Sequence, residues 1–108
     1  APSGGPLVQH VLPALFEKHR EGLISVEKIV QKTAHNPAIV FKIQDRGFVR
    51  EGYFADLAVV NPHMPQTVSR ENILYHCGWS PFEGDTFQAA ITHTFVNGTL
   101  MYENQKVN

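Results

Sequence analysis

An almost uninterrupted apolar stretch occupies residues 55–60 (Ala-Asp-Leu-Ala-Val-Val). Gly52 precedes it and Asn61-Pro62 closes it. A short run rich in β-branched residues and bounded in this way predicts a strand buried on both faces, which needs neighbours on both. Asp56 interrupts the run, and a carboxylate that enters a buried strand needs hydrogen-bond donors or an ion partner. We therefore interpret Asp56 as a residue that caps the strand entrance.

The first third of the chain has helical periodicity. Apolar residues recur three and four positions apart from Leu7 to Phe16 and predict an amphipathic helix that ends near Glu21. Pro13 lies inside this pattern and predicts a kink or a division near Leu12.

Two more helices are predicted before residue 43. Ser25 is a good N-cap for a helix that ends at residues 33–35. Asn36-Pro37 then starts a third, short helix, with asparagine as the cap and proline at the first helical position. Residues 38–41 (Ala-Ile-Val-Phe) are apolar, so we expect this helix to be largely buried.

From residue 44 the pattern changes to turns and short strands. The loop of residues 61–70 contains at most a short edge strand at residues 66–68. Near the end of the chain two β-like runs flank Asn97-Gly98, which is the strongest short signal for a hairpin. Helices therefore come first and strands second, and we expect the open sheet to lack partners within the chain.

Composition and charge limit the classes of function. Nine basic and ten acidic residues in 108 leave the chain nearly neutral, and no basic patch indicates nucleic acid. No apolar run approaches the roughly 20 residues needed to cross a bilayer. The single cysteine, Cys77, excludes an internal disulfide and fits a reducing compartment, so we expect a cytoplasmic protein. The start at Ala1 without an initiator methionine predicts a piece of a longer protein.

The residues alone nominate no complete active site. The histidines are His10, His19, His35, His63, His76 and His93. They lack the paired spacing that often announces zinc ligands, and surface or hydrogen-bonded histidines are the preferred interpretation. A nucleophilic Cys77 needs a base that nothing in the sequence nominates, so we interpret it as a small buried thiol. We predict no catalytic residue and no metal ligand in these 108 residues.

Three stretches carry a resemblance to a known family. The first is Ala1-Pro2-Ser3-Gly4, similar to an Ala-Pro-x-Gly loop. The second runs from Asn36-Pro37-Ala38 through Gly47 to Ala55-Asp56-Leu57, a pattern of helix, glycine turn and entry into a small β-domain. The third joins residues 77–84 (Cys-Gly-Trp-Ser-Pro-Phe-Glu-Gly) to residues 94–98. Together they resemble the C-terminal portion of dihydroorotases, in the cyclic amidohydrolase superfamily, over essentially the whole chain.

The resemblance implies an α/β fold in two parts. Residues 1–43 would be the last loop and helices of an amidohydrolase (β/α)8 barrel, and residues 44–108 the C-terminal strands of a flanking β-sandwich built from both chain ends. The strand at residues 55–60 would lie beside strands of the N-terminal remainder of the same enzyme. The family's zinc ligands would all precede Ala1, so the resemblance implies zinc in the full-length enzyme, none in this segment, and a segment that is inactive alone.

The resemblance also implies an activity, the interconversion of N-carbamoyl-L-aspartate and L-dihydroorotate in pyrimidine biosynthesis, by an enzyme that we expect to be a homo-oligomer. Pro2 and Gly4 match the family's substrate contacts. Backbone groups of a loop at the mouth of a barrel can hydrogen-bond the amide edge of a cyclic substrate, and glycine permits a close approach. Ser3 and Gly5-Pro6 stand where the family carries bulkier apolar residues.

Two alternatives remain open. Hydantoinases and allantoinases share the second stretch, although residues 79–82 (Trp-Ser-Pro-Phe) favour a dihydroorotase. A non-enzymatic β-interaction module would pair an exposed strand edge with another chain. Natural edges are usually blunted by lysine or proline, and the unprotected Ala58-Val59-Val60 argues against such a module.

Overall fold

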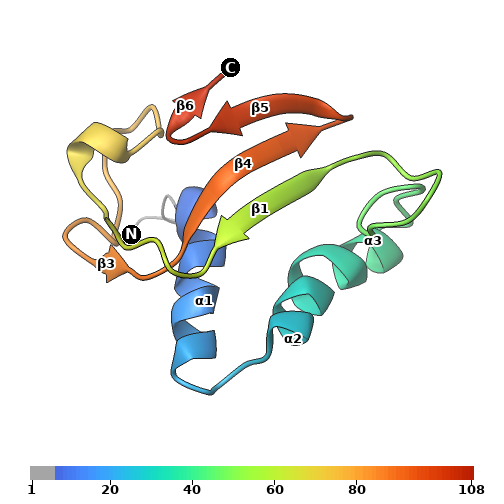
Figure 1. Ribbon diagram of the computed structural model, residues 1–108, viewed down its shortest axis with the longest axis horizontal. Coiled ribbons are helices and arrows are strands. Elements are labelled where there is room, and N and C mark those ends of the chain that lie inside the picture. The colour runs from blue at the N-terminus through green and yellow to red at the C-terminus, as the bar shows by residue number, and fades with distance from the viewer. Residues whose placement is uncertain (1–6) are drawn as a thin grey trace, which may run out of the picture.

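The computed structural model describes residues 7–108, in which the helices lie on one side of a four-stranded antiparallel sheet (Figure 1). The helices are η1 (Val8–His10), α1 (Val11–Arg20), α2 (Val26–Val30), η2 (Gln31–His35), α3 (Asn36–Val40) and η3 (Arg70–Asn72), of which η1 and η3 are 3-10 turns and η2 is a π-helix. The strands are β1 (Leu57–Asn61), β2 (Gln66–Thr67), β3 (Thr86–Phe87), β4 (Ala90–Val96), β5 (Thr99–Glu103) and β6 (Lys106–Val107). The main sheet has the order β1-β4-β5-β6, and β2 pairs with β3 separately. No helix in residues 7–108 is long and apolar enough to cross a membrane.

Helix α1 begins at Val11 and ends at Arg20, close to the predicted ends. Pro13 is its third residue. The first four N–H groups of a helix have no partner within it, so a proline there costs no hydrogen bond. The helical run is divided close to the predicted place: the change from 3-10 to α geometry falls between His10 and Val11, just before Leu12.

Helices α2, η2 and α3 form one continuous helical segment. Ser25 caps its start as predicted, since its Oγ accepts the Lys28 N–H at 3.1 Å. The predicted start of the third helix at Asn36 is confirmed, since α3 begins there after the π-helix η2 ends at His35. The predicted role of Asn36 as a cap is wrong, because Asn36 has helical angles (φ −63°, ψ −44°) and the chain is not interrupted. Pro37 has no N–H to donate, and the wider π turns of η2 lead into it, with the Asn36 N–H bonded to the carbonyl five residues back.

Helix α3 exposes the side chains that the pattern predicted to be buried. Ile39, Val40 and Phe41 are 64%, 70% and 74% exposed, whereas Ala38 is buried. Ala38 faces Gly47, so the turn after α3 covers one side of the helix and leaves its apolar side uncovered in this chain.

Strand β1 lies at an edge of the main sheet and pairs with β4 alone among the described strands. The predicted burial of both faces is wrong for this chain: Leu57 is 37% exposed and Val59 45%. The hairpin between β4 and β5 is confirmed. Asn97 and Gly98 both have positive φ (52° and 77°), as the tight hairpin turn that matches strand twist requires.

Asp56 holds the entrance of β1 through two contacts. Its Oδ1 accepts the Asn97 N–H at 2.8 Å, and its Oδ2 pairs with Arg46, whose guanidinium lies 4.1 Å from the centre of the Phe54 ring. The Asn97 hydrogen bond and then the Arg46 contact lower the pKa of Asp56 below its ordinary value of 3.8. The interpretation of Asp56 as a capping carboxylate is confirmed, and the residue joins the turn before β1 to the β4–β5 hairpin.

Asp56→Asn is expected to lower the unfolding midpoint at pH 7, because the neutral amide loses the ion pair with Arg46. The lowered pKa of Asp56 means that this stabilisation is full above pH 3.8 and disappears as the pH falls through the folded-state pKa. Urea unfolding at pH 7 and at about pH 2 should therefore show a difference that shrinks in acid. Asp45→Asn, at an exposed turn residue with positive φ that asparagine tolerates, is the matched control.

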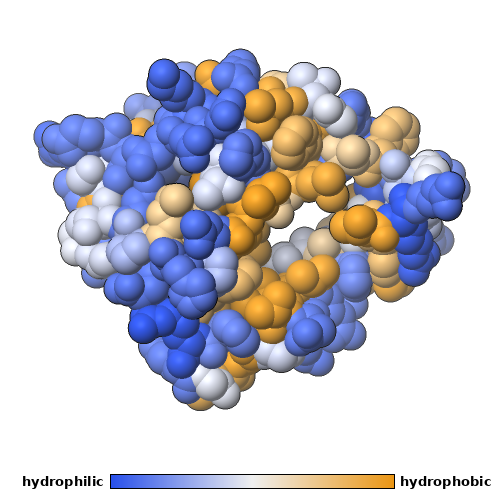
Figure 2. Space-filling view, in the orientation of Figure 1, coloured by the Kyte–Doolittle hydropathy of each residue, from blue (hydrophilic) through white to orange (hydrophobic). Residues whose placement is uncertain are grey.

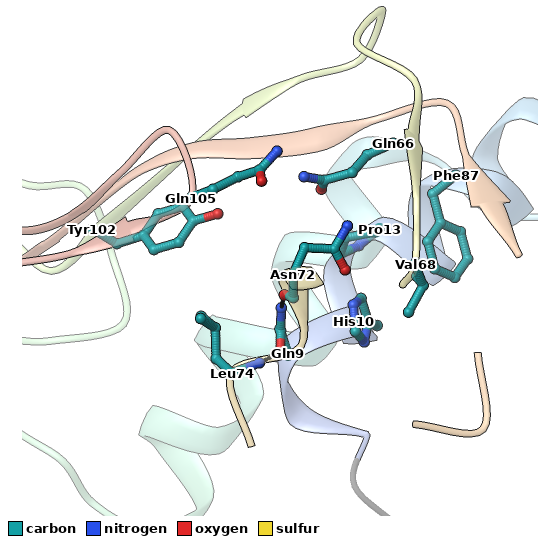
Figure 3. Close-up of a pocket in the computed structure, with 10 residues that line it drawn as sticks. All are labelled: Gln9, His10, Pro13, Gln66, Val68, Asn72, Leu74, Phe87, Tyr102 and Gln105. Carbon is teal, nitrogen blue, oxygen red and sulfur yellow. Dashed lines mark hydrogen bonds between the residues drawn. The ribbon is translucent and has the colours of Figure 1, made fainter. Parts of the chain in front are cut away.

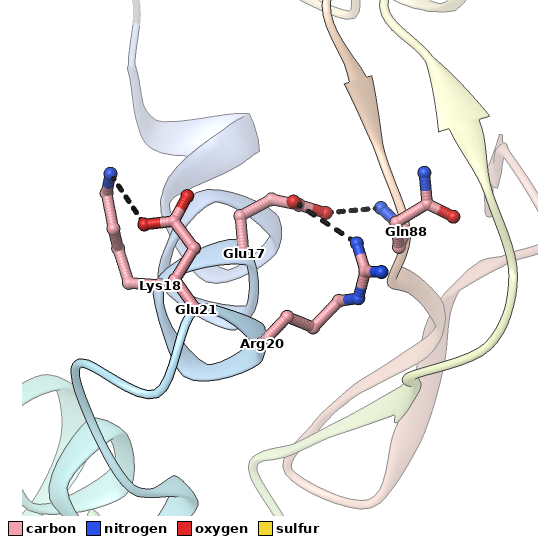
Figure 4. A network of polar contacts seen from close by, with 5 residues as sticks. All are labelled: Glu17, Lys18, Arg20, Glu21 and Gln88. Atoms are coloured by element: carbon pink, nitrogen blue, oxygen red, sulfur yellow. Dashed lines mark hydrogen bonds and ion pairs between the residues drawn. The ribbon is translucent and has the colours of Figure 1, made fainter.

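Helix α1 is tied to the connection between β3 and β4 (Figure 4). Oε1 of Glu17 accepts the Gln88 N–H at 2.7 Å, and Arg20 lies 3.5 Å from the other oxygen of the same carboxylate. Lys18 and Glu21 form a separate exposed pair at 3.4 Å. These contacts orient α1 against the β region, and the Glu17 bond spans 71 residues of sequence.

Candidate functional site

The predicted substrate contacts, Pro2 and Gly4, lie outside the described residues, and their role stays a prediction. Shortly after them, Gln9 is fixed by three hydrogen bonds. Its N–H donates to the Tyr75 hydroxyl at 2.5 Å, its Nε2 donates to the Asn72 carbonyl at 2.7 Å, and its Oε1 accepts the Leu74 N–H at 2.8 Å. Because both ends of the side-chain amide are used, Gln9 fastens the chain just before α1 to the segment after η3.

His10 is the buried residue beside this fastening, with 6% of its surface exposed. Its ring lies among Tyr75, Phe82 and Phe87, with centroid distances of 6.5, 6.0 and 6.1 Å. Its Nδ1 has no hydrogen-bond partner among the described residues. Burial lowers the pKa of His10 below its ordinary value of 6.5, because charging the ring inside this cluster costs hydration.

A cavity of about 20 Å³ opens beside the His10 ring (Figure 3). Its walls come from the start of α1, from β2 and the segment after it, from β3, and from the end of β5. The lining residues are Gln9, His10, Pro13, Gln66, Val68, Asn72, Leu74, Phe87, Tyr102 and Gln105. A volume of this size holds about one water molecule, so the cavity does not accommodate an organic substrate.

A much larger hollow separates β1 from the helices, and Figure 2 shows apolar side chains around its rim. Its volume is about 510 Å³. The lining residues are Val11, Leu12, Phe16, Val26, Ile29, Val30, Thr33, Ala34, His35, Gly47, Phe48, Val49, Asp56, Leu57, Ala58 and Val60. An apolar wall with one carboxylate, which is already bonded to Asn97 and Arg46, suits packing against protein rather than catalysis.

A second open space, of about 630 Å³, adjoins the first on the side of α1 and the end of β1. Phe16, Val26 and Val60 line both spaces, and His19, Arg20 and His63 add a polar border to the second. His19 is engaged through Nδ1 with the Ile24 carbonyl at 2.8 Å. The two spaces therefore form one apolar surface with basic groups at its margin.

The other histidines have separate surroundings. The His35 ring stacks on Phe48 with centroids 4.1 Å apart and an interplanar angle of 7°. His93 contacts Thr92 through Nδ1 at 2.8 Å and Glu103 through Nε2 at 3.8 Å. Within residues 7–108, no three side chains of His, Cys, Asp or Glu come together as a metal site would require.

The structure corrects the interpretation of Cys77. The thiol is exposed rather than buried, and its Sγ lies 3.8 Å from the Trp79 carbonyl in an aromatic loop whose tryptophan is itself half exposed. Gly78 and Gly84 have positive φ (72° and 92°), a conformation that glycine adopts without strain. Between them, Ser80 is buried and Phe82 packs against His10 and Phe87, so the loop exposes Cys77 and Trp79 while part of it faces inward.

Sequence reasoning missed Gln9 and His10 as a structural centre. The partners of Gln9 lie 63 to 66 residues further along the chain, so no local pattern could announce them. One signal was present: two adjacent polar residues follow Val8 and precede Val11 inside an apolar helical pattern.

Comparison with solved structures and with family models identifies the class of protein to which the chain belongs. The L-hydantoinase from Arthrobacter aurescens matches this structure with a TM-score of 0.90 and 26% identity, over 100% of this chain and 24% of its own. The family model of the amidohydrolase family matches residues 6–101. The chain belongs to the amidohydrolase family, and the predicted fold class, part of an amidohydrolase α/β fold, is confirmed.

Sequence relatives fall in the same family. The dihydroorotase of Halobacterium salinarum is 36% identical over 110 residues, which cover 100% of this chain and 25% of that protein. An allantoinase of Desulfitobacterium hafniense is 36% identical over 80 residues, covering 74% of this chain and 18% of that protein. The chain thus spans about a quarter of the length of the dihydroorotase that it matches.

Proposed function

We propose that this chain is part of a dihydroorotase, an enzyme of pyrimidine biosynthesis that interconverts N-carbamoyl-L-aspartate and L-dihydroorotate. The observation that carries the proposal is the extent of the sequence match. The dihydroorotase of H. salinarum aligns with the whole chain, whereas the allantoinase of D. hafniense aligns with 74% of it at the same identity.

A hydantoinase-type amidohydrolase is the second candidate, since the A. aurescens L-hydantoinase superposes on the whole chain. Structural similarity shows a shared fold, and one fold can carry several activities. The similarity therefore supports the class of cyclic-amide hydrolases, but it does not select a particular substrate within that class. The non-enzymatic β-module has weaker support. Its main evidence would be the exposed edge of β1. In the proposed enzyme the same edge would be exposed here because the neighbouring strand belongs to another part of the protein.

In this proposal the chain contributes to substrate binding through its opening residues. Pro2 and Gly4 would present backbone groups to the amide edge of the ring, and Gln9 would hold the chain a few residues further on. Zinc would bind to the full-length enzyme through ligands upstream of Ala1 and would supply the activation of water. Within residues 7–108, no three side chains of His, Cys, Asp or Glu lie close enough together to hold the metal.

The proposal assigns the apolar hollow to the rest of the enzyme. Residues 1–43 would complete the barrel and residues 44–108 the sandwich, with the N-terminal remainder filling the space beside β1 and the helices. The exposed Leu57 and Val59 and the lining of the hollow supply the apolar surface that such packing needs. We propose a cytoplasmic homo-oligomer for the assembled enzyme.

The test is a substrate panel on the full-length protein. We expect hydrolysis of L-dihydroorotate, and its formation from N-carbamoyl-L-aspartate, with a kcat/KM about a thousandfold or more above that for dihydrouracil, hydantoin and allantoin. The reason is that a site built to pair with the substrate carboxylate leaves a buried charged group unpaired when an analogue lacks it. Initial rates from absorbance of the cyclic substrates give the ratio.

Removal of metal by a chelator, followed by addition of Zn²⁺, provides the accompanying control. Loss and recovery of turnover support a metal-dependent amidohydrolase. Preference for hydantoin or allantoin over L-dihydroorotate would contradict the substrate assignment while leaving the family unchanged. The 108-residue chain alone, assayed alongside, is expected to show no turnover.

A further inference from the structure

Two observations in the region of Gln9 and His10 point to a function that the substrate proposal does not use. Gln9 joins the start of α1 to residues 72–75 by three hydrogen bonds. Next to it, His10 is 6% exposed, lies among aromatic rings, and has no hydrogen-bond partner for Nδ1 within residues 7–108. We call the region of residues 66–87, against which both side chains pack, the aromatic lobe.

We propose that Gln9 and His10 form a latch that fastens the start of α1 to the aromatic lobe when the imidazole is neutral and opens when the imidazole is protonated. The inference does not depend on the identity of the substrate. It rests on the burial of a titratable ring at a junction that Gln9 already holds by direct hydrogen bonds.

Among residues 7–108, the surroundings of His10 offer a protonated ring no counter-ion. Tyr75 faces it from the segment after η3, Phe82 and Phe87 from the aromatic loop and β3, and Tyr102 from β5. No Asp, Glu, Lys or Arg is among the residues that line the cavity at the ring. An imidazolium in this place would be a buried charge without a counter-ion, which proteins avoid by moving the group into water.

The charged side chains of the aromatic lobe, Arg70, Glu71, Glu83 and Asp85, are all exposed to solvent. Arg70 and Glu83 lie 3.9 Å apart in an exposed pair, and Glu71 is held at the start of η3 by hydrogen bonds that lower its pKa. On α1, Glu17 accepts the Gln88 N–H. The local charge balance therefore leaves the protonation of His10 uncompensated.

The lowered pKa of His10 sets the direction in which pH changes the strength of the latch. Burial lowers the pKa of His10 below 6.5, so the folded latch binds its proton less readily than the open form does. The latch is at full strength above pH 6.5 and weakens as the pH falls below that value, until His10 is protonated in the closed form as well. In acid, the ratio of open to closed latch rises about tenfold for each pH unit by which burial lowers the pKa of His10.

The experiment follows the latch in the 108-residue chain by NMR. The His10 ring signals should titrate below pH 6.5. The amide protons of Gln9 and Leu74, which donate across the latch, should lose protection between pH 7 and pH 5 after correction for intrinsic exchange, while amides paired between β4 and β5 keep theirs. Titration of His10 at or above 6.5, or unchanged protection of both amides, would overturn the proposal.

Two variants separate the latch from other acid effects. His10→Phe keeps an aromatic ring and removes the proton site, so protection of the Leu74 amide should become independent of pH over this range. His76→Gln changes an exposed histidine of the same lobe and should leave the acid step in place. Should His10→Phe fail to fold, the titration and exchange data on the unaltered chain decide; an acid step that persists in a folded His10→Phe chain contradicts the latch.

Discussion

Replacing Gly47 by alanine is expected to lower the free energy of unfolding by about 2 to 5 kcal/mol, from backbone strain and overpacking together. Gly47 has φ of +86°, a left-handed conformation that costs a residue with a Cβ about 1 to 2 kcal/mol. An alanine Cβ would also lie 2.5 Å from the Ala38 Cβ and 2.9 Å from the Ala34 carbonyl oxygen. The turn would have to move away from the η2–α3 helical segment.

Gly52→Ala is the matched control for this prediction. Gly52 has the same φ of +86°, and a Cβ placed there meets nothing within 4 Å. Its loss should be confined to the strain of about 1 to 2 kcal/mol. Urea unfolding of both variants measures the difference, and equal losses would show that the contact with Ala38 and Ala34 is not the tight one described here.

Val30→Lys is expected to cost the full-length protein about 3 to 5 kcal/mol and much of its soluble yield, because an ammonium group would be enclosed without a counter-ion where the hollow is filled. In the 108-residue chain the same change should stay within about 0.5 kcal/mol, since Val30 is 41% exposed there and lysine can reach water. The effect thus depends on the proposal that the remainder of the enzyme occupies the hollow beside β1.

Gln31→Lys supplies the comparison within the same continuous helical segment. Gln31 is polar and exposed and does not line the hollow. Thermal unfolding of both variants is measured in the 108-residue chain and in the full-length protein, which gives four changes in stability. The excess loss at Val30 in the full-length protein is the contribution of burial in the hollow. Equal tolerance of lysine at both positions of the full-length protein would place the remainder of the enzyme elsewhere.

Much of the fold could be predicted because its signals are local. The Ser25 cap, the Asn97-Gly98 hairpin and the amphipathic helix α1 each depend on residues within one or two turns, and each was found where the pattern indicated. The errors share a cause as well. The cap expected at Asn36 followed a sound local rule for Asn-Pro, and the π-helix that leads into it has no equally simple sequence signal.

The candidate site was less predictable, for two reasons. Pro2 and Gly4 rest on resemblance and lie outside the described residues. Gln9 and His10 contact partners more than 60 residues further along the chain. Without those partners, two polar residues in a helical pattern predict a face exposed to solvent. Cys77 shows the opposite error, since a residue type that is usually buried lies in an exposed loop.

By itself the sequence determined the elements whose signals are local, namely the Ser25 cap, helix α1 and the Asn97-Gly98 hairpin, because side-chain spacing and capping chemistry act over a few residues. It also showed that Asp56 needs a donor, although that donor, Asn97, lies 41 residues away. The amidohydrolase family was indicated by resemblance rather than by spacing. Only the tertiary structure decided how the elements lie relative to one another. Among residues 7–108, β1 is an edge strand, its apolar side chains line a hollow shared with the helices, and the Nδ1 of the buried His10 has no hydrogen-bond partner. Whether a side chain is buried depends on which residues pack against it, and those residues come from segments far apart in the chain.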